Sequence, residues 1–493
     1  MRINYNVSAA VANKRLLGIE GNLAKSMERL SSGLKINHAK DNPAGMAISN
    51  KMRAQISGLD RASGNASDGI SALHIADGAL GEITDILQRM RELSVQAANS
   101  GTMSLDDKQA VQDEIESLKK EVDRISSDTE YNTKTLLDGS LDTRVYGDHV
   151  SRVQVSDHVK EGMYGLTIEE AAKQATVGTD GKDFRDDTNK VGASGVISIN
   201  GSSVEISADD TYAQAYEKIR NAAEIGGVSA LRDENTGAVS FVSDDYGRSA
   251  GVEITFDNED LANAIGLKAA DGYGVVEDKD NDRWVYGKND PAANKIVTPT
   301  GSDIQFEKDP ATGKVKLDGF SSSATVKTDG NRVTITDIGG VSISFLAEAG
   351  YKGDINLEVT DIGRMTLHVG ANKDQNMEVR IPEVSCESLY IDDLNVMTVD
   401  GADRGMTRLS EAIAQASSVR SGIGAYENRL EYSVNSLDAF EENMTGALSR
   451  LTDLDMADEM TEYTHQNVLN QAAISVLTQA NELPQQVLQI LRP

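Results

Sequence analysis

The last residues of the chain carry an apolar stripe whose spacing requires a partner helix. Its members lie alternately four and three residues apart: Leu469, Ala473, Val476, Ala480, Leu483, Val487 and Ile490. This spacing keeps one face of an α-helix turned toward a second helix, as in a coiled coil. A similar stripe near the N-terminus contains Leu16, Leu23, Met27, Leu30 and Leu34. We expect the two chain ends to pair with each other and with further copies.

Long helices are also predicted between these ends. Residues 44–100 contain no proline, and their leucines at 59, 73, 80 and 87 recur at multiples of seven. Asp41-Asn42-Pro43 marks the end of one helix and the start of the next, and Ser104 predicts the N-cap of a third helix. A second long helix is expected from about Met406 to the region 453–458. Pro484 predicts a kink or local break in the terminal helix.

The middle of the chain follows a different pattern, with alternating apolar residues and turns rich in Gly and Asp. Six of the seven Phe residues and the single Trp284 lie within residues 145–360. Residues 196–206 predict a β-hairpin that turns at Asn200-Gly201. A helix over 211–225 and a second hairpin over 228–243 follow. Further strands are expected within 297–306, 315–318 and 325–345, giving one or two α+β subdomains. After the insert, residues 365–381 and 389–396 predict hairpin strands.

The predicted fold class is mainly α with an α+β insert. Both chain ends form an elongated antiparallel coiled-coil rod, and a β-rich outer domain is inserted in the middle. The expected domains are an N-terminal core helix (1–43), the N-terminal part of the rod (44–144), the surface-exposed insert (145–360), the C-terminal part of the rod with a β-hairpin (361–454) and a C-terminal core helix (455–493).

Composition excludes several classes of function. The net charge of −30 argues against nucleic-acid binding, because a phosphate-binding surface must be basic. No stretch reaches about 18 apolar residues, so no membrane span is expected. The N-terminal residues lack the apolar region of a secretory signal peptide. The single cysteine, Cys386, cannot form an internal disulfide and is interpreted as a buried, inert thiol.

No catalytic, cofactor-binding or metal-binding motif is found, so the chain is predicted not to be an enzyme and to need no cofactor. The six His residues form no HExxH pair, and neither a Walker loop nor a G-x-S-x-G motif is present. Asp278, Asp280 and Asp282 alternate as in a calcium loop. However, Arg283 stands where that loop requires glycine, and Asn289 stands where it requires glutamate, so no calcium site is expected.

Stripes on both chain ends are compatible with two assemblies. A surface that matches another part of the same molecule gives head-to-tail association, which produces a helical filament when the rotation does not close. An ordinary coiled-coil dimer with a globular head is the alternative, and the stripes alone do not separate the two.

The amino-acid sequence of the helical arms resembles that of bacterial flagellin. The resemblance rests on RLSSGLKIN (29–37), AKDNPAGMAI (39–48), QRMRELSVQAAN (88–99) and QANELPQQVL (479–488), and it covers about 1–140 and 365–493. Residues 196–256 resemble a repeat found inside flagellins and filament-cap proteins. Two features depart from the family pattern: Pro493 follows the usual final arginine, and the rod hairpin follows the insert instead of preceding it.

The resemblance implies a structural subunit of an extracellular, secreted flagellar filament for motility. It implies self-polymerisation through the core stripes, contacts with hook-associated and cap proteins, and export through the flagellar type III apparatus. An export chaperone would bind the C-terminal segment containing Val468, Leu469, Val476, Leu477, Val487 and Leu488. A hook–filament junction protein, or an adhesin built on a flagellin scaffold, remains the alternative.

The resemblance also implies that the host Toll-like flagellin receptor recognises this chain. The matching positions lie on two helices of the rod: Gln88, Arg89, Glu92, Leu93 and Glu114. A role as solvated residues or as ion pairs between subunits is compatible with the same positions.

Overall fold

The computed structural model describes residues 6–99, 103–156, 158–269, 272–279, 281, 283–290, 295–310, 313–360 and 362–490, and it shows side chains only up to residue 483 in the last helix. The chain divides into two compact units. The first comprises Met1–Ile70, Leu367–Met377 and Asn428–Pro493, and the second comprises Ser71–Thr366 and Glu378–Glu427. Two long helices contribute residues to both units: α2 (Pro43–Ala97) and α6 (Val399–Thr452).

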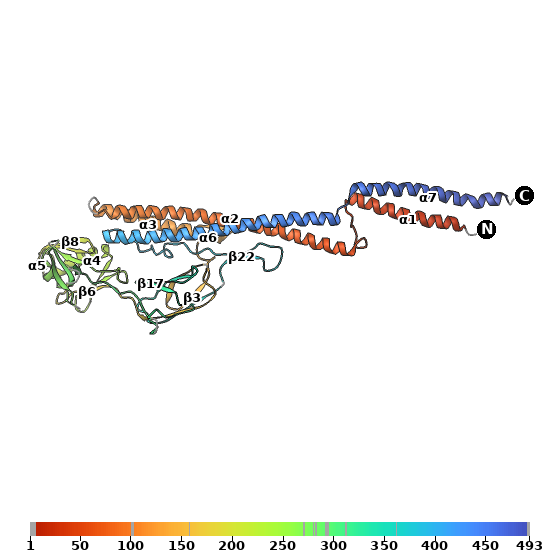
Figure 1. Ribbon diagram of the computed structural model, residues 1–493. Helices are drawn as coiled ribbons and strands as arrows, with labels where there is room; N and C mark the ends of the chain where they lie inside the picture. The colour runs from red at the N-terminus through yellow and green to blue at the C-terminus, as the bar shows by residue number, and fades with distance from the viewer. Residues whose placement is uncertain are drawn as a thin grey trace. The chain divides into compact units, whose positions relative to one another are not determined.

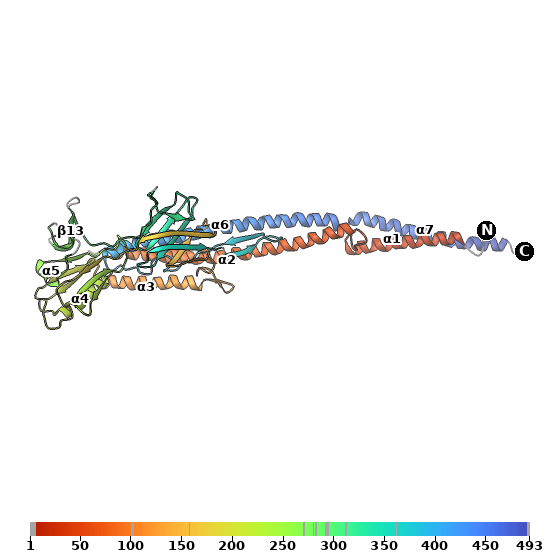
Figure 2. The ribbon, with the colours of Figure 1, turned by 90° about the horizontal axis from the view of Figure 1, so that it is seen from below.

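In the first unit, the helices α1 (Val7–Ser32) and α7 (Met456–Ile490) lie side by side and antiparallel (Figures 1 and 2). Asn6 caps α1, because its side-chain oxygen accepts a hydrogen bond from Ala9 N at 3.1 Å. The Asn6 amide also donates to Ala480 O at 2.9 Å. Toward the other end of α1, Ser26 Oγ donates to Glu459 Oε1 at 2.6 Å. The predicted pairing of the two chain ends is therefore present within a single chain.

The junctions that follow α1 and precede α7 are tied together by backbone hydrogen bonds. Gly33 ends α1 at a φ of 72°, a left-handed conformation that glycine adopts without strain. Lys35 N then donates to Thr452 O at 2.7 Å, and Leu454 N donates to Gly33 O at 3.0 Å. The predicted break between the last two helices lies here, between Thr452 and Met456.

A small hairpin of β21 (Met365–His368) and β22 (Asn376–Val379) follows the insert, as predicted. Its residues in the first unit rest on glycines of α2. A Cβ at Gly69 would lie 2.5 Å from Leu367 Cδ1, and one at Gly58 would lie 3.0 Å from Ala371 Cβ. The helix therefore supplies two positions without side chains, which let the hairpin approach its backbone.

In the second unit, the C-terminal part of α2 packs with α3 (Leu105–Asp128) and the N-terminal part of α6 (Figure 2). Ser104 and Asp107 form a reciprocal capping box at the start of α3, which confirms the predicted N-cap. A short hairpin of β1 (Glu130–Tyr131) and β2 (Lys134–Thr135) follows α3. The fully buried rows of this helical body include Leu73, Leu80, Leu87, Ile115, Val122, Leu409 and Ile423.

The insert contains two subdomains with separate cores, and the first, the inner subdomain, is all β. Its strands form two antiparallel sheets, in the orders β15-β5-β20-β3 (with β16 on β5) and β17-β18-β19-β4. One core, which includes Leu166, Ile335 and Phe345, lies between them. The strands are β3 (Val145–Gly147), β4 (Val150–Val155), β5 (Gly162–Glu170), β15 (Gln305–Phe306), β16 (Leu317–Asp318), β17 (Thr325–Asp329), β18 (Arg332–Thr336), β19 (Ser342–Ala347) and β20 (Gly353–Val359).

The outer subdomain is α+β and is inserted between β5 and β15 of the inner one. Its core includes Phe184, Ile197, Ile219 and Phe241. The elements are β6 (Thr176–Gly178), β7 (Gly195–Ile199), β8 (Ser202–Ile206), α4 (Tyr212–Ile225), β9 (Val228–Arg232), β10 (Val239–Ser243), β11 (Ile254–Phe256), α5 (Glu259–Ile265), β12 (Gly274–Asp278), β13 (Arg283–Asp290) and β14 (Lys295–Val297).

The predicted hairpin turn at Asn200-Gly201 is confirmed. Both residues have positive φ, 47° and 83°, as a two-residue hairpin turn requires. The Asn200 side chain donates to Gly226 O at 3.0 Å and accepts from Glu253 N at 2.8 Å. The turn residue thereby joins three segments of the outer subdomain.

Three details of the expected fold are wrong. Residues 389–396 form turns instead of a strand, because their backbone finds side-chain partners on α3: Val396 N donates to Gln112 Oε1 at 2.8 Å. The helix α6 already begins at Val399, before Met406. The helix α7 continues through Pro484 without a break. Asp280 and Asp282, from the rejected calcium loop, lie outside the described residues.

Candidate assembly and recognition surfaces

The faces that α1 and α7 turn toward each other bury little. Among their described side chains, only Ser26 and Ala480 are fully buried. The other facing residues are half-buried and recur with a 3-4 spacing: Ala9, Ala12, Leu16, Ile19, Leu23 and Leu30 on α1, and Glu459, Tyr463, Gln466, Asn470, Ala473 and Leu477 on α7. This mixture of small, polar and apolar residues gives the pair no continuous hydrophobic core.

Large apolar side chains instead point outward from the pair. Val7, Val468 and Val476 are 67%, 58% and 56% exposed, and further outward residues are Val11, Leu17, Met27, Met456, Met460, Leu469, Ile474 and Leu483. A shallow groove of about 590 Å³ is lined by Val7, Val11, Ala12, Ala473 and Val476, among others. Such a concentration of exposed apolar surface is typical of a protein–protein interface.

The predicted core residues are divided between these two faces. Leu16, Leu23, Leu30 and Leu477 turn toward the partner helix of the same chain, whereas Met27, Val468, Leu469, Val476 and Leu483 turn outward. Leu34 lies beyond α1, opposite Asp453 in an isolated β-bridge. The side chains of Val487, Leu488 and Ile490, and all of Pro493, lie outside the described part of the chain.

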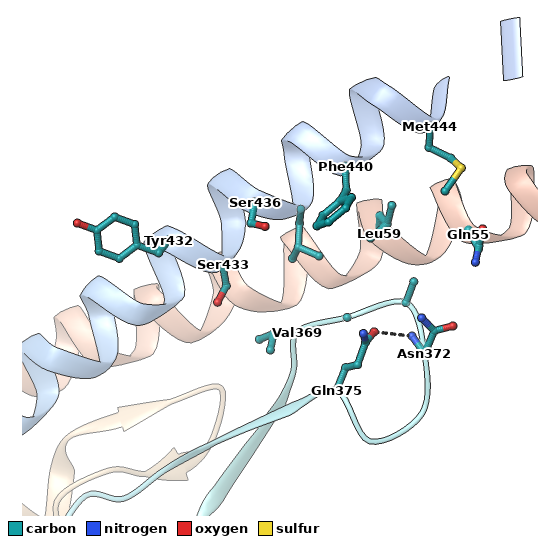
Figure 3. Close-up of a pocket in the computed structure, with 13 residues that line it drawn as sticks. Gln55, Leu59, Val369, Asn372, Gln375, Tyr432, Ser433, Ser436, Phe440 and Met444 are labelled. Atoms are coloured by element: carbon teal, nitrogen blue, oxygen red, sulfur yellow. Dashed lines mark hydrogen bonds between the residues drawn. The ribbon is translucent and has the colours of Figure 1, made fainter. Parts of the chain in front are cut away.

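A second groove, of about 520 Å³, lies between α2, α6 and the tip of the β21–β22 hairpin in the first unit (Figure 3). Phe440 and Tyr432 of α6 line it and are 62% and 76% exposed. On the hairpin side, Gln375 Oε1 accepts a hydrogen bond from Asn372 N at 2.9 Å, which orders the loop. Sequence analysis does not single out this groove. The available signal was two aromatic residues eight positions apart on a helix otherwise poor in them.

The predicted recognition surface on α2 and α3 presents four of its five residues to solvent. Arg89 donates to Glu114 Oε1 from Nη2 at 2.9 Å and from Nε at 3.2 Å. Glu92 lies 3.5 Å from Arg89 Nη1, and Gln88 is exposed beside them. The hydrogen bond and charge of Glu114 raise the pKa of Arg89, which therefore stays charged.

The fifth predicted residue, Leu93, is only 2% exposed and belongs to the core of the helical body. Its position follows from helix geometry, because Leu93 lies on the same face of α2 as the buried Met90 and Ala97. Leu93 therefore cannot contact a partner while the helices are packed.

Other classes of site find no support in the part of the chain that the structure describes. No helix there is both long and apolar enough to cross a membrane. No group of three or more His, Cys, Asp or Glu side chains is placed to hold a metal ion within the described ranges. Cys386 is buried and free, and burial raises the pKa of its thiol, which disfavours the reactive thiolate.

Comparison with known proteins identifies the family. The model of the bacterial flagellin N-terminal helical region matches residues 3–142, and that of the C-terminal helical region matches residues 406–491. Flagellin from Clostridium tyrobutyricum is 30% identical, over 98% of this chain and 100% of its own length. The chain belongs to the bacterial flagellin family. Flagellin from Bacillus subtilis is 31% identical over the full length of both chains.

Flagellins are structural proteins of the extracellular flagellar filament, so this chain belongs to a family of structural proteins. Among solved structures, FliC from Burkholderia pseudomallei is similar over 73% of this chain and 99% of its own, with 18% identity and a TM-score of 0.23. The flagellar junction protein FlgL from Legionella pneumophila is similar over 82% of this chain and 99% of its own, with 11% identity and a TM-score of 0.28.

Proposed function

We propose that this chain polymerises head to tail into the helical flagellar filament, with α1 and α7 making the contacts between copies in the filament core. The observation that carries this proposal is the outward apolar surface of the two helices. Burying a Val or Leu side chain contributes about 1.5–3 kcal/mol, and most of this gain is unrealised in the single chain. A neighbouring copy that covers Val7, Val468 and Val476 would supply it.

Under this proposal, residues 1–43 and 455–493 form the filament core, and residues 44–144 and 361–454 form the rod around it. Residues 145–360 project outward. The groove that contains Phe440 is a further candidate contact between rods, because its aromatic residues are exposed in the first unit of the single chain.

Seeded elongation tests the proposal. Purified protein that has been monomerised by heat and mixed with filament fragments is expected to extend them into long tubular filaments, observed by electron microscopy. Unseeded monomer at the same concentration is the control. Short rings or caps that do not elongate would contradict the major-subunit function and favour a junction protein.

We further propose that the chain is exported by the flagellar type III apparatus and meets hook-associated and cap proteins at the filament ends. An export chaperone is proposed to bind the segment containing Val468, Leu469, Val476, Leu477, Val487 and Leu488. The first three of these side chains are exposed on α7, so a chaperone can cover them before assembly. This cover would also prevent early polymerisation.

A host Toll-like flagellin receptor is proposed to bind the surface of Gln88, Arg89, Glu92 and Glu114. Arg89→Ala is expected to lower signalling by the monomer about tenfold in a cell reporter assay, since a specific charged contact contributes about 1.4 kcal/mol or more. Arg124→Ala is the matched control, because Arg124 is also exposed on this helical body and pairs with Glu121 at 2.6 Å. Equal signalling by both variants would contradict the proposed surface.

A further inference from the structure

The inner subdomain is attached to the rod by partly buried contacts. Tyr390, in the turns before α6, has the guanidinium carbon of Arg332 4.1 Å from its ring centroid. Arg332 Nη1 also donates to Glu411 Oε2 of α6 at 3.1 Å. Arg152 of β4 makes a bidentate pair with Asp392, at 3.0 and 2.8 Å. Charged groups from two strands therefore bind both α6 and the segment before it.

The loop of residues 244–249, which follows β10 of the outer subdomain, contacts both the inner subdomain and the rod. Tyr246 of this loop packs against the core of the inner subdomain. Arg248 N donates to Asp303 Oδ1 at 3.0 Å, and Ser249 Oγ donates to Asp329 Oδ1 at 3.0 Å. These contacts attach one side of the loop to the inner subdomain. The outer subdomain can rotate about this attachment.

The other side of the loop faces the rod, and Asp245 makes the contact. Arg404 Nη1 of α6 donates to Asp245 Oδ2 at 2.8 Å, and Arg408 Nη2 donates to Asp245 Oδ1 at 3.3 Å. Arg408 Nη1 also donates to Asp393 at 2.5 Å. One carboxylate thus bridges two arginines on successive turns of the helix. The neighbouring contact is also polar: Asn395 Nδ2 donates to Ile225 O at 3.2 Å.

This contact is partly buried and lies beside a cavity. The side chains of Asp245, Arg404 and Arg408 are 31%, 30% and 31% exposed. A cavity of about 240 Å³ lies beside them, lined mainly by glycines and polar residues that include Gly227 and Gly405. Salt weakens a partly exposed ion pair to the extent that water reaches it. On its other side the loop is held by the packing of Tyr246 and by the ion pair of Arg248 with Asp303, at 3.4 Å.

We propose that Asp245 is an ionic latch that holds the outer subdomain against the rod, and that opening it lets this subdomain pivot about Tyr246. Neutralising the carboxylate releases the rod contact, and salt weakens it. The inner subdomain keeps its own attachment to the rod, because the contacts of Arg332 and Arg152 with the Tyr390 ring do not involve Asp245. The orientation of the outer subdomain is thereby controlled by one charged side chain of the loop.

Distance measurements between two spin labels test the latch in the full-length monomer. Cysteines replace Ser203 in the outer subdomain and Ser117 on α3, since both serines are exposed. The buried Cys386, whose Sγ lies 3.3 Å from Lys119 O, is left unlabelled. We expect one narrow distance distribution at low salt that broadens in about 1 M NaCl, where the screening length falls to about 3 Å.

Asp245→Asn is expected to give the broad distribution at low salt. Asp244→Asn is the matched control, because the neighbouring Asp244 accepts from Ser229 Oγ at 2.6 Å within the outer subdomain, and it should keep the narrow distribution. Fluorescence of the single Trp284 reports whether the outer subdomain stays folded. The rod-side variant Arg404→Gln/Arg408→Gln, which leaves the outer subdomain unchanged, should broaden the distribution equally. A narrow distribution in Asp245→Asn or in the rod-side variant would overturn the latch.

Discussion

Val476→Glu is expected to slow seeded filament elongation by at least about tenfold while leaving the monomer folded. Val476 is 56% exposed and lines a groove with Val7 and Val11, so the single chain tolerates a charge there. In a filament the same position would be covered by a neighbour, and a carboxylate without a partner is costly to bury. Light scattering after addition of seeds measures the elongation rate, and circular dichroism of the monomer checks the fold.

Gln479→Glu is the control for this experiment, because it adds the same charge at an exposed position of the same helix. It should elongate at a rate close to that of the wild type. Equal rates for Val476→Glu and Gln479→Glu would mean that the outward stripe makes no contact between copies. A pull-down with the export chaperone tests the second proposed function of this segment, which is chaperone binding. Val476→Glu is expected to bind the chaperone more weakly than Gln479→Glu.

Leu93→Ala is expected to lower the free energy of unfolding of the helical body by about 2–5 kcal/mol. Leu93 is 2% exposed, and its truncation removes apolar contacts and leaves a cavity that close-packed helices fill incompletely. Guanidinium denaturation followed by helical circular dichroism measures the loss. Arg89→Ala should leave the same transition nearly unchanged, because Arg89 is exposed and its ion pair with Glu114 is screened by solvent.

This pair of variants separates recognition from stability. A loss of receptor signalling in Leu93→Ala, accompanied by destabilisation, would report on the packing of α2 and not on contact with the receptor. A loss in Arg89→Ala, with an unchanged unfolding transition, would report on the surface itself. If Leu93→Ala unfolded like the wild type, the placement of Leu93 in the core would be wrong.

Local signals in the sequence predicted several elements well because their causes are local. At the start of α3, the side chains of Ser104 and Asp107 each accept a hydrogen bond from the backbone N–H of the other residue. No distant residue is needed for this capping box. Asn200-Gly201 likewise adopts the left-handed conformations of its turn whatever surrounds it. The long helices follow from leucines that recur with a seven-residue period and become buried in the second unit.

The register of the terminal helices could not be predicted in the same way. On α7, the seven-residue spacing of Leu469, Val476 and Leu483 is compatible with either the inner or the outer face, since several apolar rows run along one helix. The structure turns Asn470 and Leu477 toward α1 instead. Hydrogen bonds at both ends of the pair set this choice, and they join residues more than 430 positions apart.

Residues 389–396 show a different limit of sequence analysis. Their apolar residues suggest a strand, and Leu389, Ile391, Leu394 and Val396 are indeed buried. However, their backbone binds side chains of distant helical residues such as Gln112, which no local pattern reveals. No local pattern reveals the partners of Asp245 either. Its carboxylate reaches Arg404 and Arg408 only when the insert folds against α6.

The nesting of one subdomain within another makes the outer part of the insert removable as a unit. The chain leaves and re-enters the inner subdomain at Lys173 and Ser302, which are joined by two backbone hydrogen bonds of 2.9 and 3.0 Å. Because the two ends of the nested segment are adjacent, the segment can be deleted or replaced without re-routing any strand of the inner sheets. The outer subdomain is therefore a cassette in the topological sense, since a short link between residues 173 and 302 would close the inner subdomain.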